Sequence, residues 1–305
     1  MQQPQFVEQS EPEEVFGLLS DDNRVEILRT LWNGDEPMGF SELHDAVGIG
    51  DSGQFNYHLK RLVDQFVTNS EEGYELTIAG DQINGAIESG SYTTSGRMEP
   101  VQMDSPCPTC GGTRTFYYED ELAMLECDSC SLEARYDIPP GVFADCDREE
   151  IPAVAGRYLR TMVERLHHGF CTRCDGPVEH AVCPITDIPS WSEEDEEETE
   201  DSPFGSPEEI PIVQHECRQC AHKVTTGLQY SLLTHPAVVG FHYDRGIDIR
   251  DRSVWEFTIL GFDRERVRGT DPFRANTVFT VDNDALTVVV DEEMRVVETT
   301  VDEAT

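Results

Sequence analysis

Apolar and polar positions in the first 90 residues follow the 3.6-residue period of helices, interrupted by short polar turns. Residues 13–32 predict a helix that is broken near residue 20, where Ser20 or Asp21 caps the second part. Residues 41–47 predict a short second helix. A third helix is predicted to reach about Phe66, with Asp51 or Ser52 as its N-cap.

Period-two patterns appear after this helical segment. Residues 67–69 and 74–76 predict a hairpin, and Thr77 then caps a helix that reaches about residue 88. Residues 89–105 have the composition of a linker. Farther along, the chain predicts strands at 116–125 and 276–300, a helix at 149–168, and a helix followed by a strand at 230–243.

The charge of the chain changes how any nucleic-acid hypothesis is judged. The net charge is -39 at pH 7. Of the 22 basic residues, only Lys60 and Lys223 are lysine, and the others are arginine. Abundant Asp and Glu with almost no Lys resembles the proteins of salt-in halophiles. At about 1 M salt the Debye length is about 3 Å, so this charge would repel DNA only at close range. An acidic protein that avoids DNA is the competing interpretation.

Targeting signals are not evident in the sequence. No apolar run approaches the roughly 20 residues that a membrane span needs, and residues 1–20 lack an apolar signal core. We therefore expect a cytoplasmic protein without a membrane partner.

Eight of the ten cysteines form pairs with two intervening residues. They are Cys107 and Cys110, Cys127 and Cys130, Cys171 and Cys174, and Cys217 and Cys220. Such a pair lets one tight turn present two sulfurs, and Zn²⁺ favours four ligands in a tetrahedron. The spacing predicts one zinc site per four cysteines, with the acidic segment 190–209 as a disordered insertion within the second set. An interleaved use of the eight ligands is the alternative.

We expect both metals to be structural, because four thiolates leave no open position for water. Redox or metal sensing is the alternative, since oxidised thiolates would release zinc. Cys146 and Cys183 lie outside the pairs and are either buried core residues or sensing thiols. His167 and His168 are either an extra metal ligand or helix-end histidines.

The third predicted helix carries the best indication of DNA contact. Its apolar stripe leaves Gln54, Tyr57, Lys60 and Arg61 facing outward. Amide side chains can pair with adenine, while Lys and Arg meet guanine or phosphate. One of the two lysines therefore lies on this face, within an acidic segment.

Residues 19–28, 40–43 and 57–62 resemble the ArsR-type winged-helix regulators, and residues 74–80 are similar to that family's strand leading into its last helix. The resemblance covers about residues 12–90. It implies binding of double-stranded DNA as a homodimer, through an interface of the first and last helices. By position, it implies DNA contacts from Ser52, Gln54, Asn56, Tyr57, His58, Lys60 and Arg61.

Two features depart from that family. Residues 1–106 contain no cysteine, so metal sensing by a Cys-x-Cys motif is not expected. The hairpin tip is Glu71-Glu72, where a basic residue would normally reach the minor groove. A winged helix used for protein docking is therefore a second interpretation.

The predicted fold class is α+β: an N-terminal winged helix-turn-helix, two zinc-ribbon-like β modules and a C-terminal α+β lobe. The predicted divisions are a DNA-binding domain (1–90), a linker (91–105), a first ribbon (106–148), a connecting helix (149–169), a second ribbon (170–226) and an α+β tail (227–305).

The first functional hypothesis is a DNA-binding transcriptional regulator with a zinc-stabilised interaction or sensing region. The second is a transcription-machinery factor that works through protein contacts, because a winged helix followed by a zinc ribbon is also similar to archaeal transcription factor E alpha. No phosphate-binding glycine loop, nucleophile elbow or HExxH motif is present, so we do not expect an enzyme.

Overall fold

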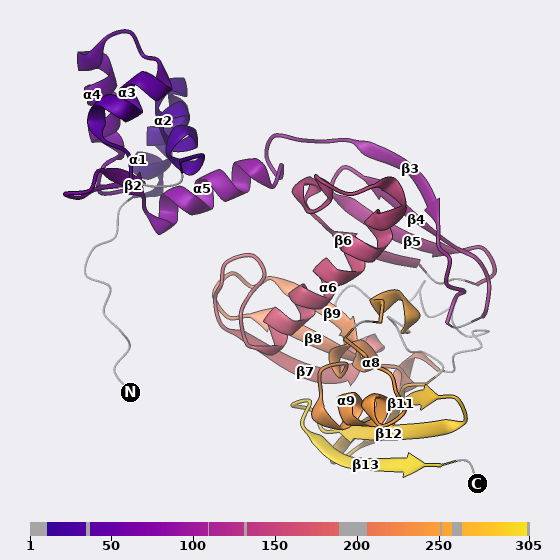
Figure 1. The fold of residues 1–305 in the computed structure, drawn as a ribbon. Coiled ribbons are helices and arrows are strands. Elements are labelled where there is room, and N and C mark those ends of the chain that lie inside the picture. The colour runs from indigo at the N-terminus through magenta and orange to yellow at the C-terminus, as the bar shows by residue number, and fades with distance from the viewer. Residues whose placement is uncertain are drawn as a thin grey trace. The chain divides into compact units, whose positions relative to one another are not determined.

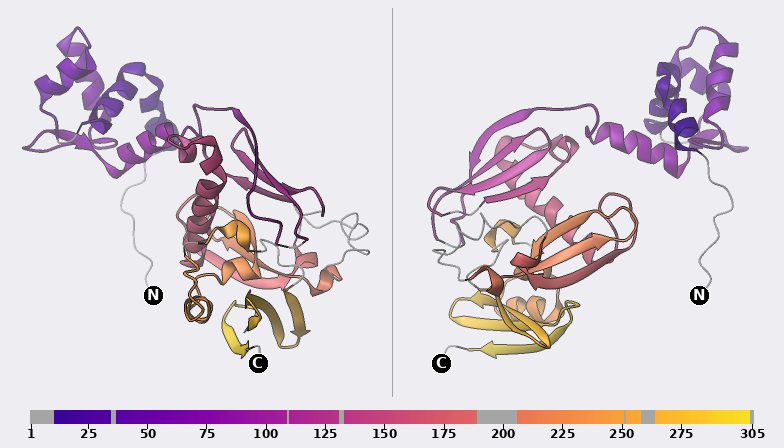
Figure 2. Two further views of the ribbon diagram at one scale, coloured as in Figure 1. Left: turned by 45° about the vertical axis from the view of Figure 1, so that its right-hand side comes forward. Right: turned by 180° about the vertical axis from the view of Figure 1, so that it is seen from behind.

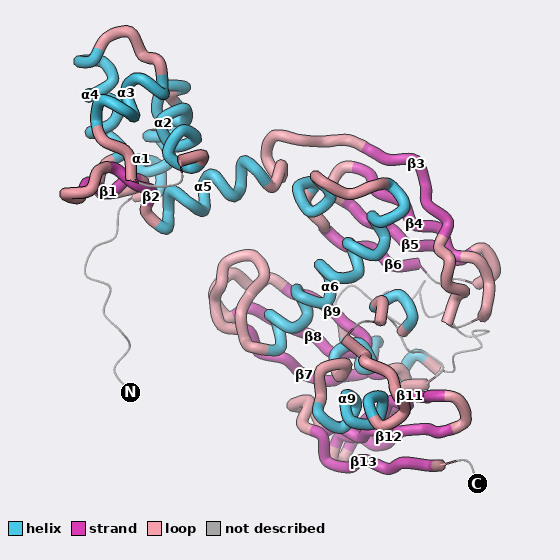
Figure 3. The backbone as a smooth tube through the Cα atoms, in the orientation of Figure 1, coloured by secondary structure: helices cyan, strands magenta, loops and turns pink. Residues whose placement is uncertain are grey.

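The computed structural model describes residues 11–34, 37–108, 110–130, 133–188, 206–250, 252–257 and 264–303. The chain forms two compact units, one of Met1–Ser95 with Pro139–Gly141 and one of Gly96–Ile138 with Val142–Thr305. The fold is α+β, and its sheets are antiparallel (Figures 1 and 3).

The first unit is mainly helical. Its elements are α1 (Pro12–Gly17), α2 (Asp22–Trp32), α3 (Phe40–Val47), α4 (Ser52–Leu62), the hairpin β1 (Val67–Asn69) with β2 (Tyr74–Leu76), and α5 (Ile78–Glu88). Three predicted caps are confirmed. Asp21 accepts a hydrogen bond from the Asn23 N–H at 3.0 Å, Asp51 from Gln54, and Thr77 from Gly80.

A single apolar core holds this unit together. Its fully buried members are Ile27 of α2, Leu43 of α3, Phe55 and Leu62 of α4, and Val67 of β1. Gly48 joins α3 to α4 with a φ of 75°, a left-handed conformation that glycine adopts without steric cost. The predicted end of the third helix at Phe66 is wrong, since the helix stops at Leu62 and Asp64 takes a φ of 74°.

The second unit contains three antiparallel sheets within the described residues. The first is β3 (Arg97–Gln102), β4 (Arg114–Glu119), β5 (Leu122–Cys127) and β6 (Glu133–Asp137). The second is β7 (Val178–Pro184), β8 (Pro211–Cys217) and β9 (Lys223–Gly227). The third is β10 (Arg266–Thr270), β11 (Phe273–Val281), β12 (Asp284–Val290) and β13 (Val296–Asp302).

Helix α6 (Ile151–His167) follows the first sheet, as the sequence predicts, and leads into the second (Figure 2). Its buried stripe enters the same hydrophobic core as all three sheets. That core includes Phe116 of β4, Leu159 of α6, Val213 of β8 and Phe279 of β11. The predicted ribbons, connecting helix and tail therefore all contribute side chains to one hydrophobic core.

Two predictions for this unit need correction. Residues 97–102 of the predicted linker form β3, which pairs with β4 at the edge of the first sheet. Residues 230–243 contain no strand: α8 (Leu228–Ser231) and α9 (Pro236–Tyr243) lie there. Pro236 starts α9, where its fixed φ and missing N–H suit a first helical turn.

The predicted acidic insertion at 190–209 lies outside the described residues except for 206–209, where Pro207–Glu209 form one 3-10 turn. Among the described helices, none combines the length and the apolar character that crossing a membrane requires.

Candidate metal centres and the exposed face of helix α4

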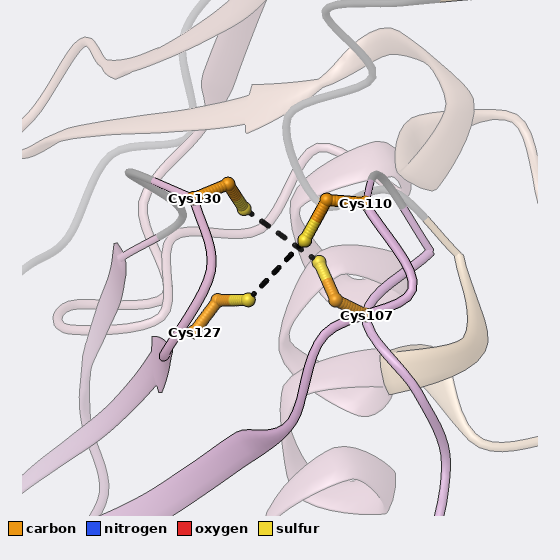
Figure 4. A group of neighbouring side chains, drawn as sticks. All are labelled: Cys107, Cys110, Cys127 and Cys130. Atoms are coloured by element: carbon orange, nitrogen blue, oxygen red, sulfur yellow. Dashed lines mark hydrogen bonds between the residues drawn. The ribbon is translucent and has the colours of Figure 1, made fainter.

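The first cysteine cluster unites two turns of the first sheet. Cys107 and Cys110 precede β4, and Cys127 and Cys130 lie at the end of β5 and just beyond it. The four sulfurs point toward one another (Figure 4). The Sγ atoms of Cys107 and Cys130 are 3.8 Å apart, and those of Cys110 and Cys127 are 3.5 Å apart.

The second cluster repeats this arrangement on the second sheet. Cys171 and Cys174 lie between α6 and β7, while Cys217 ends β8 and Cys220 precedes β9. The Sγ separations are 3.8 Å between Cys171 and Cys220 and 3.5 Å between Cys174 and Cys217. Each set of four therefore forms its own cluster, and the interleaved alternative is excluded.

Backbone N–H groups of these turns point at the cysteine sulfurs. The N–H groups of Gly112 and Arg173 donate to the Sγ atoms of Cys110 and Cys171, both at 3.4 Å. The N–H groups of Cys220 and Gln219, together with the thiols of Cys174 and Cys220, outweigh burial and lower the pKa of Cys217 to about 7. Donors aimed at sulfur stabilise the thiolate, which is the form that binds a metal.

The geometry of both clusters fits a tetrahedral metal ion. A Zn–S distance of about 2.3 Å in a tetrahedron places sulfurs roughly 3.8 Å apart. The observed separations of 3.5–3.8 Å need little adjustment to meet this value. The chain thus has two four-cysteine clusters that can hold metal ions, consistent with two structural sites in ribbon-like modules.

The cysteines outside the clusters are half-buried. Cys183 packs against the apolar group formed by Ile185, Ile210 and Ile212, and burial raises its pKa to about 11. A thiol of this kind is protonated at neutral pH and reacts slowly. The Cys146 Sγ lies 3.9 Å from the carbonyl oxygen of Val142. Neither His167 nor His168 belongs to a cysteine cluster.

Six of the seven predicted DNA-contacting residues lie on or beside one exposed face of α4. Ser52, Gln54, Tyr57, Lys60 and Arg61 are exposed, and Asn56 is half-buried.

The prediction for His58 is wrong. Its side chain is buried, because it lies between Phe55 and Leu62 on the apolar stripe, and its Nδ1 is 3.4 Å from the Asp21 carboxylate. It is therefore part of the packing under α4 and does not reach the surface.

Comparisons with known proteins give two family matches. Residues 12–87 match the family described as "Domain of unknown function (DUF7347)", and residues 104–296 match the family described as "Domain of unknown function (DUF7351)". Neither the comparison with curated proteins nor that with solved structures finds a match. Since residues 104–296 make up more than half of its 305 residues, the chain belongs to the DUF7351 family.

Proposed function

We propose that this protein is a DNA-binding transcriptional regulator, with an ArsR-like winged helix in its first unit and two zinc ions in its second. The observation that carries the proposal is the exposed face of α4. Gln54, Tyr57, Lys60 and Arg61 project from one helix whose opposite face is buried in the core. This set can donate to base edges and phosphates along the major groove.

The order of elements in the first unit supports the proposal. Helices α2 and α3 precede α4 across the turn at Gly48, and the β1–β2 hairpin follows α4. In a helix-turn-helix, the second helix of the pair enters the major groove. Here that helix is α4, so the predicted contacts fall on the element expected to read DNA.

A homodimer is part of this proposal and follows from the family resemblance. The first and last helices of the unit, α1 and α5, would form its interface. Each carries a large apolar side chain in solvent: Phe16 is 62% exposed and Ile78 is 79% exposed. Dimerisation would cover both, and a two-fold protein matches a palindromic DNA site.

The second unit supplies zinc-stabilised structure in this proposal. A tetrahedron of four thiolates is the usual ligand set of a structural Zn²⁺ site. With all positions taken by sulfur, the ion has no place for substrate or water and acts on folding. The unit would then serve as an interaction or sensing region for the DNA-binding unit, within a cytoplasmic protein.

One observation favours a second candidate function. The β1–β2 hairpin ends in Glu71 and Glu72, both exposed. Two carboxylates at this tip would repel a DNA backbone, whereas they suit a basic protein surface. In this candidate, a factor of the transcription machinery uses the first unit and the ribbons for protein contacts.

Alanine substitution of Tyr57, Lys60 and Arg61 together tests the two candidates. Zinc-loaded protein in multimolar KCl would first be used to select genomic fragments, because high salt suppresses generic phosphate binding. A regulator should enrich palindromic sites, and the triple variant should bind them more than about 100-fold more weakly, since each lost base contact costs about 1–3 kcal/mol.

The matched control is a triple alanine variant of Glu71, Glu72 and Glu75, which removes exposed side chains from the hairpin. DNA binding should be kept or strengthened in this control. No enrichment by folded wild-type protein, together with loss of polymerase association in the control variant, would overturn the regulator and support the docking factor.

A further inference from the structure

Three histidines of the second unit lie close together at the second sheet. His180 of β7 and His215 of β8 are paired across the sheet, and His167 ends α6. The ring centroids are 5.5 Å apart for His167 and His215, 5.9 Å for His180 and His215, and 6.4 Å for His167 and His180. Strand register and the end of a helix thus bring together imidazoles that are distant in the sequence.

Each of these rings has a buried nitrogen without a hydrogen-bond partner among the described residues. The atoms are His167 Nε2, His180 Nδ1 and His215 Nδ1. An unsatisfied buried polar atom costs about 1–3 kcal/mol, so native structures rarely contain three in one place. Three such atoms together indicate a group that binds all of them.

The surroundings of His215 indicate which of its nitrogens is available. Its Nε2 lies 3.0 Å from Thr226 Oγ1, and that oxygen lies 2.6 Å from Ser231 Oγ. With its proton on Nε2 and donated to Thr226, the ring keeps a lone pair on Nδ1, the unpartnered atom. A histidine that binds a metal through one ring nitrogen ordinarily donates the N–H of its other ring nitrogen to a neighbouring acceptor.

We propose that His167, His180 and His215 form a third metal site, which binds a divalent first-row transition metal such as Zn²⁺ through three imidazole nitrogens. Imidazole is a good ligand for these ions. Three protein ligands leave one coordination position open to water or to an exogenous anion, unlike the four-thiolate sites. At this site, unlike at the cysteine clusters, a bound metal can exchange or take a small ligand.

The histidine site closes when the ion binds. Among the described residues, only the two cysteine clusters already hold all their ligand atoms within 4.8 Å of one another. Metal–nitrogen distances of about 2.0–2.1 Å would place the ring centroids roughly 5 Å apart. The observed 5.5–6.4 Å separations therefore require the rings to turn inward. We expect weaker binding here than at the cysteine clusters, because the site must rearrange.

Titration of the full-length apoprotein with Co²⁺ tests the site. The first two equivalents should produce intense sulfur-to-cobalt charge-transfer absorption from the cysteine clusters. A third equivalent should add only weak visible bands, since nitrogen ligands give no such charge transfer. His180→Phe and His167→Phe keep a ring in place but remove the ligating nitrogen, and each should bind two equivalents instead of three.

The matched control is His168→Phe, because His168 is exposed and lies outside the cluster. This variant should bind three equivalents. Binding of only two equivalents by the wild type, or of three by both cluster variants, would overturn the proposal and leave water as the partner of these nitrogens. If the variants lose the cysteine-bound metal, the ¹⁵N chemical shifts of the wild-type histidine rings test the proposal instead. The third equivalent of metal must then shift the signals of all three histidines.

Discussion

Asp21 carries two interactions with a single carboxylate. It caps α2 by accepting the Asn23 N–H at 3.0 Å, and it lies 3.4 Å from the ring of His58. Burial acts to raise the pKa of Asp21, but the charges of His58 and Arg24 and the Asn23 hydrogen bonds outweigh it, so the pKa lies below 3.8. The same group therefore starts a helix and faces the buried side of α4.

Replacing Asp21 by alanine should lower the free energy of unfolding by about 1 kcal/mol, the usual cost of losing an N-cap. Asp22→Ala is the matched control, because it removes the same charge from the first turn but no cap, and should cost about 0.5 kcal/mol. Thermal unfolding followed by circular dichroism measures both. Equal costs for the two variants would contradict a capping role for Asp21.

The pH dependence of this effect has a definite sign. Because the folded-state pKa of Asp21 is lowered, its stabilising contribution is present above the ordinary value of 3.8 and is lost as the pH falls through the lowered pKa. The difference in the free energy of unfolding between wild type and Asp21→Ala should therefore have its full size at pH 7 and should vanish in acid. A difference that grows toward low pH would be inconsistent with this assignment.

At the scale of the element, three of the four cysteine-pair turns share one backbone design. Cys107 donates its N–H to Gly112, Cys171 to Gly176, and Cys217 to His222, at 2.8–2.9 Å. The residue after the second cysteine has a positive φ in these three turns: 75° at Gly111, 57° at Asp175 and 57° at Ala221. The CxxC pattern thus specifies a local loop, and its sulfur positions follow from that loop.

In the turn that begins at Cys171, Gly176 leaves no room for a side chain. A Cβ there would lie 2.7 Å from the Gln219 Cβ and 3.2 Å from the Cys174 Sγ. Gly176→Ala should therefore push the two turns of the second cluster apart and reduce tightly bound metal from two equivalents to one. Metal analysis of the purified protein, together with Co²⁺ charge-transfer intensity, measures this loss.

The control is Gly240→Ala in α9, where a Cβ would meet nothing within 4 Å. Alanine is a better helix former, so this variant should keep both metals and gain up to about 1 kcal/mol of stability. Retention of two equivalents with unchanged affinity in Gly176→Ala would show that the turns are looser than their geometry indicates.

At the scale of the whole molecule, Arg114 connects distant parts of the second unit. It lies at the start of β4 and is 1% exposed. Its Nη1 donates to the carbonyl oxygen of Trp255 at 2.5 Å and its Nη2 to Ser105 Oγ at 2.7 Å. Trp255 in turn donates through Nε1 to the carbonyl oxygen of Pro152 in α6 at 2.6 Å. These hydrogen bonds connect the first sheet to the segment around Trp255, which lies about 140 residues later in the chain.

Arg114→Met should destabilise the second unit by about 2–4 kcal/mol, because it leaves buried acceptors without donors. Arg295→Met is the control: its side chain is 73% exposed and its ion pair with Asp291 is at 3.9 Å, so the cost should stay under about 1 kcal/mol. Denaturant unfolding followed by tryptophan fluorescence measures both. Similar midpoints for the two variants would show that Arg114 does not hold the unit together.

Short-range patterns account for what the sequence determined by itself. Helix caps at Asp21, Asp51 and Thr77, the hairpin at residues 67–76 and the two cysteine sets were predictable, because each depends on residues a few positions apart. The sequence also placed Gln54, Tyr57, Lys60 and Arg61 on the open face of α4, since helical period alone fixes that face.

Only the tertiary structure decided the features that depend on contacts between distant segments. His58 is buried because α2 and α4 pack together, and β3 forms from a polar segment because an edge strand needs a partner on one side only. The shared core of the three sheets and the meeting of His167, His180 and His215 depend on register and helix placement. Long-range packing sets these positions, and no local spacing in the chain encodes them.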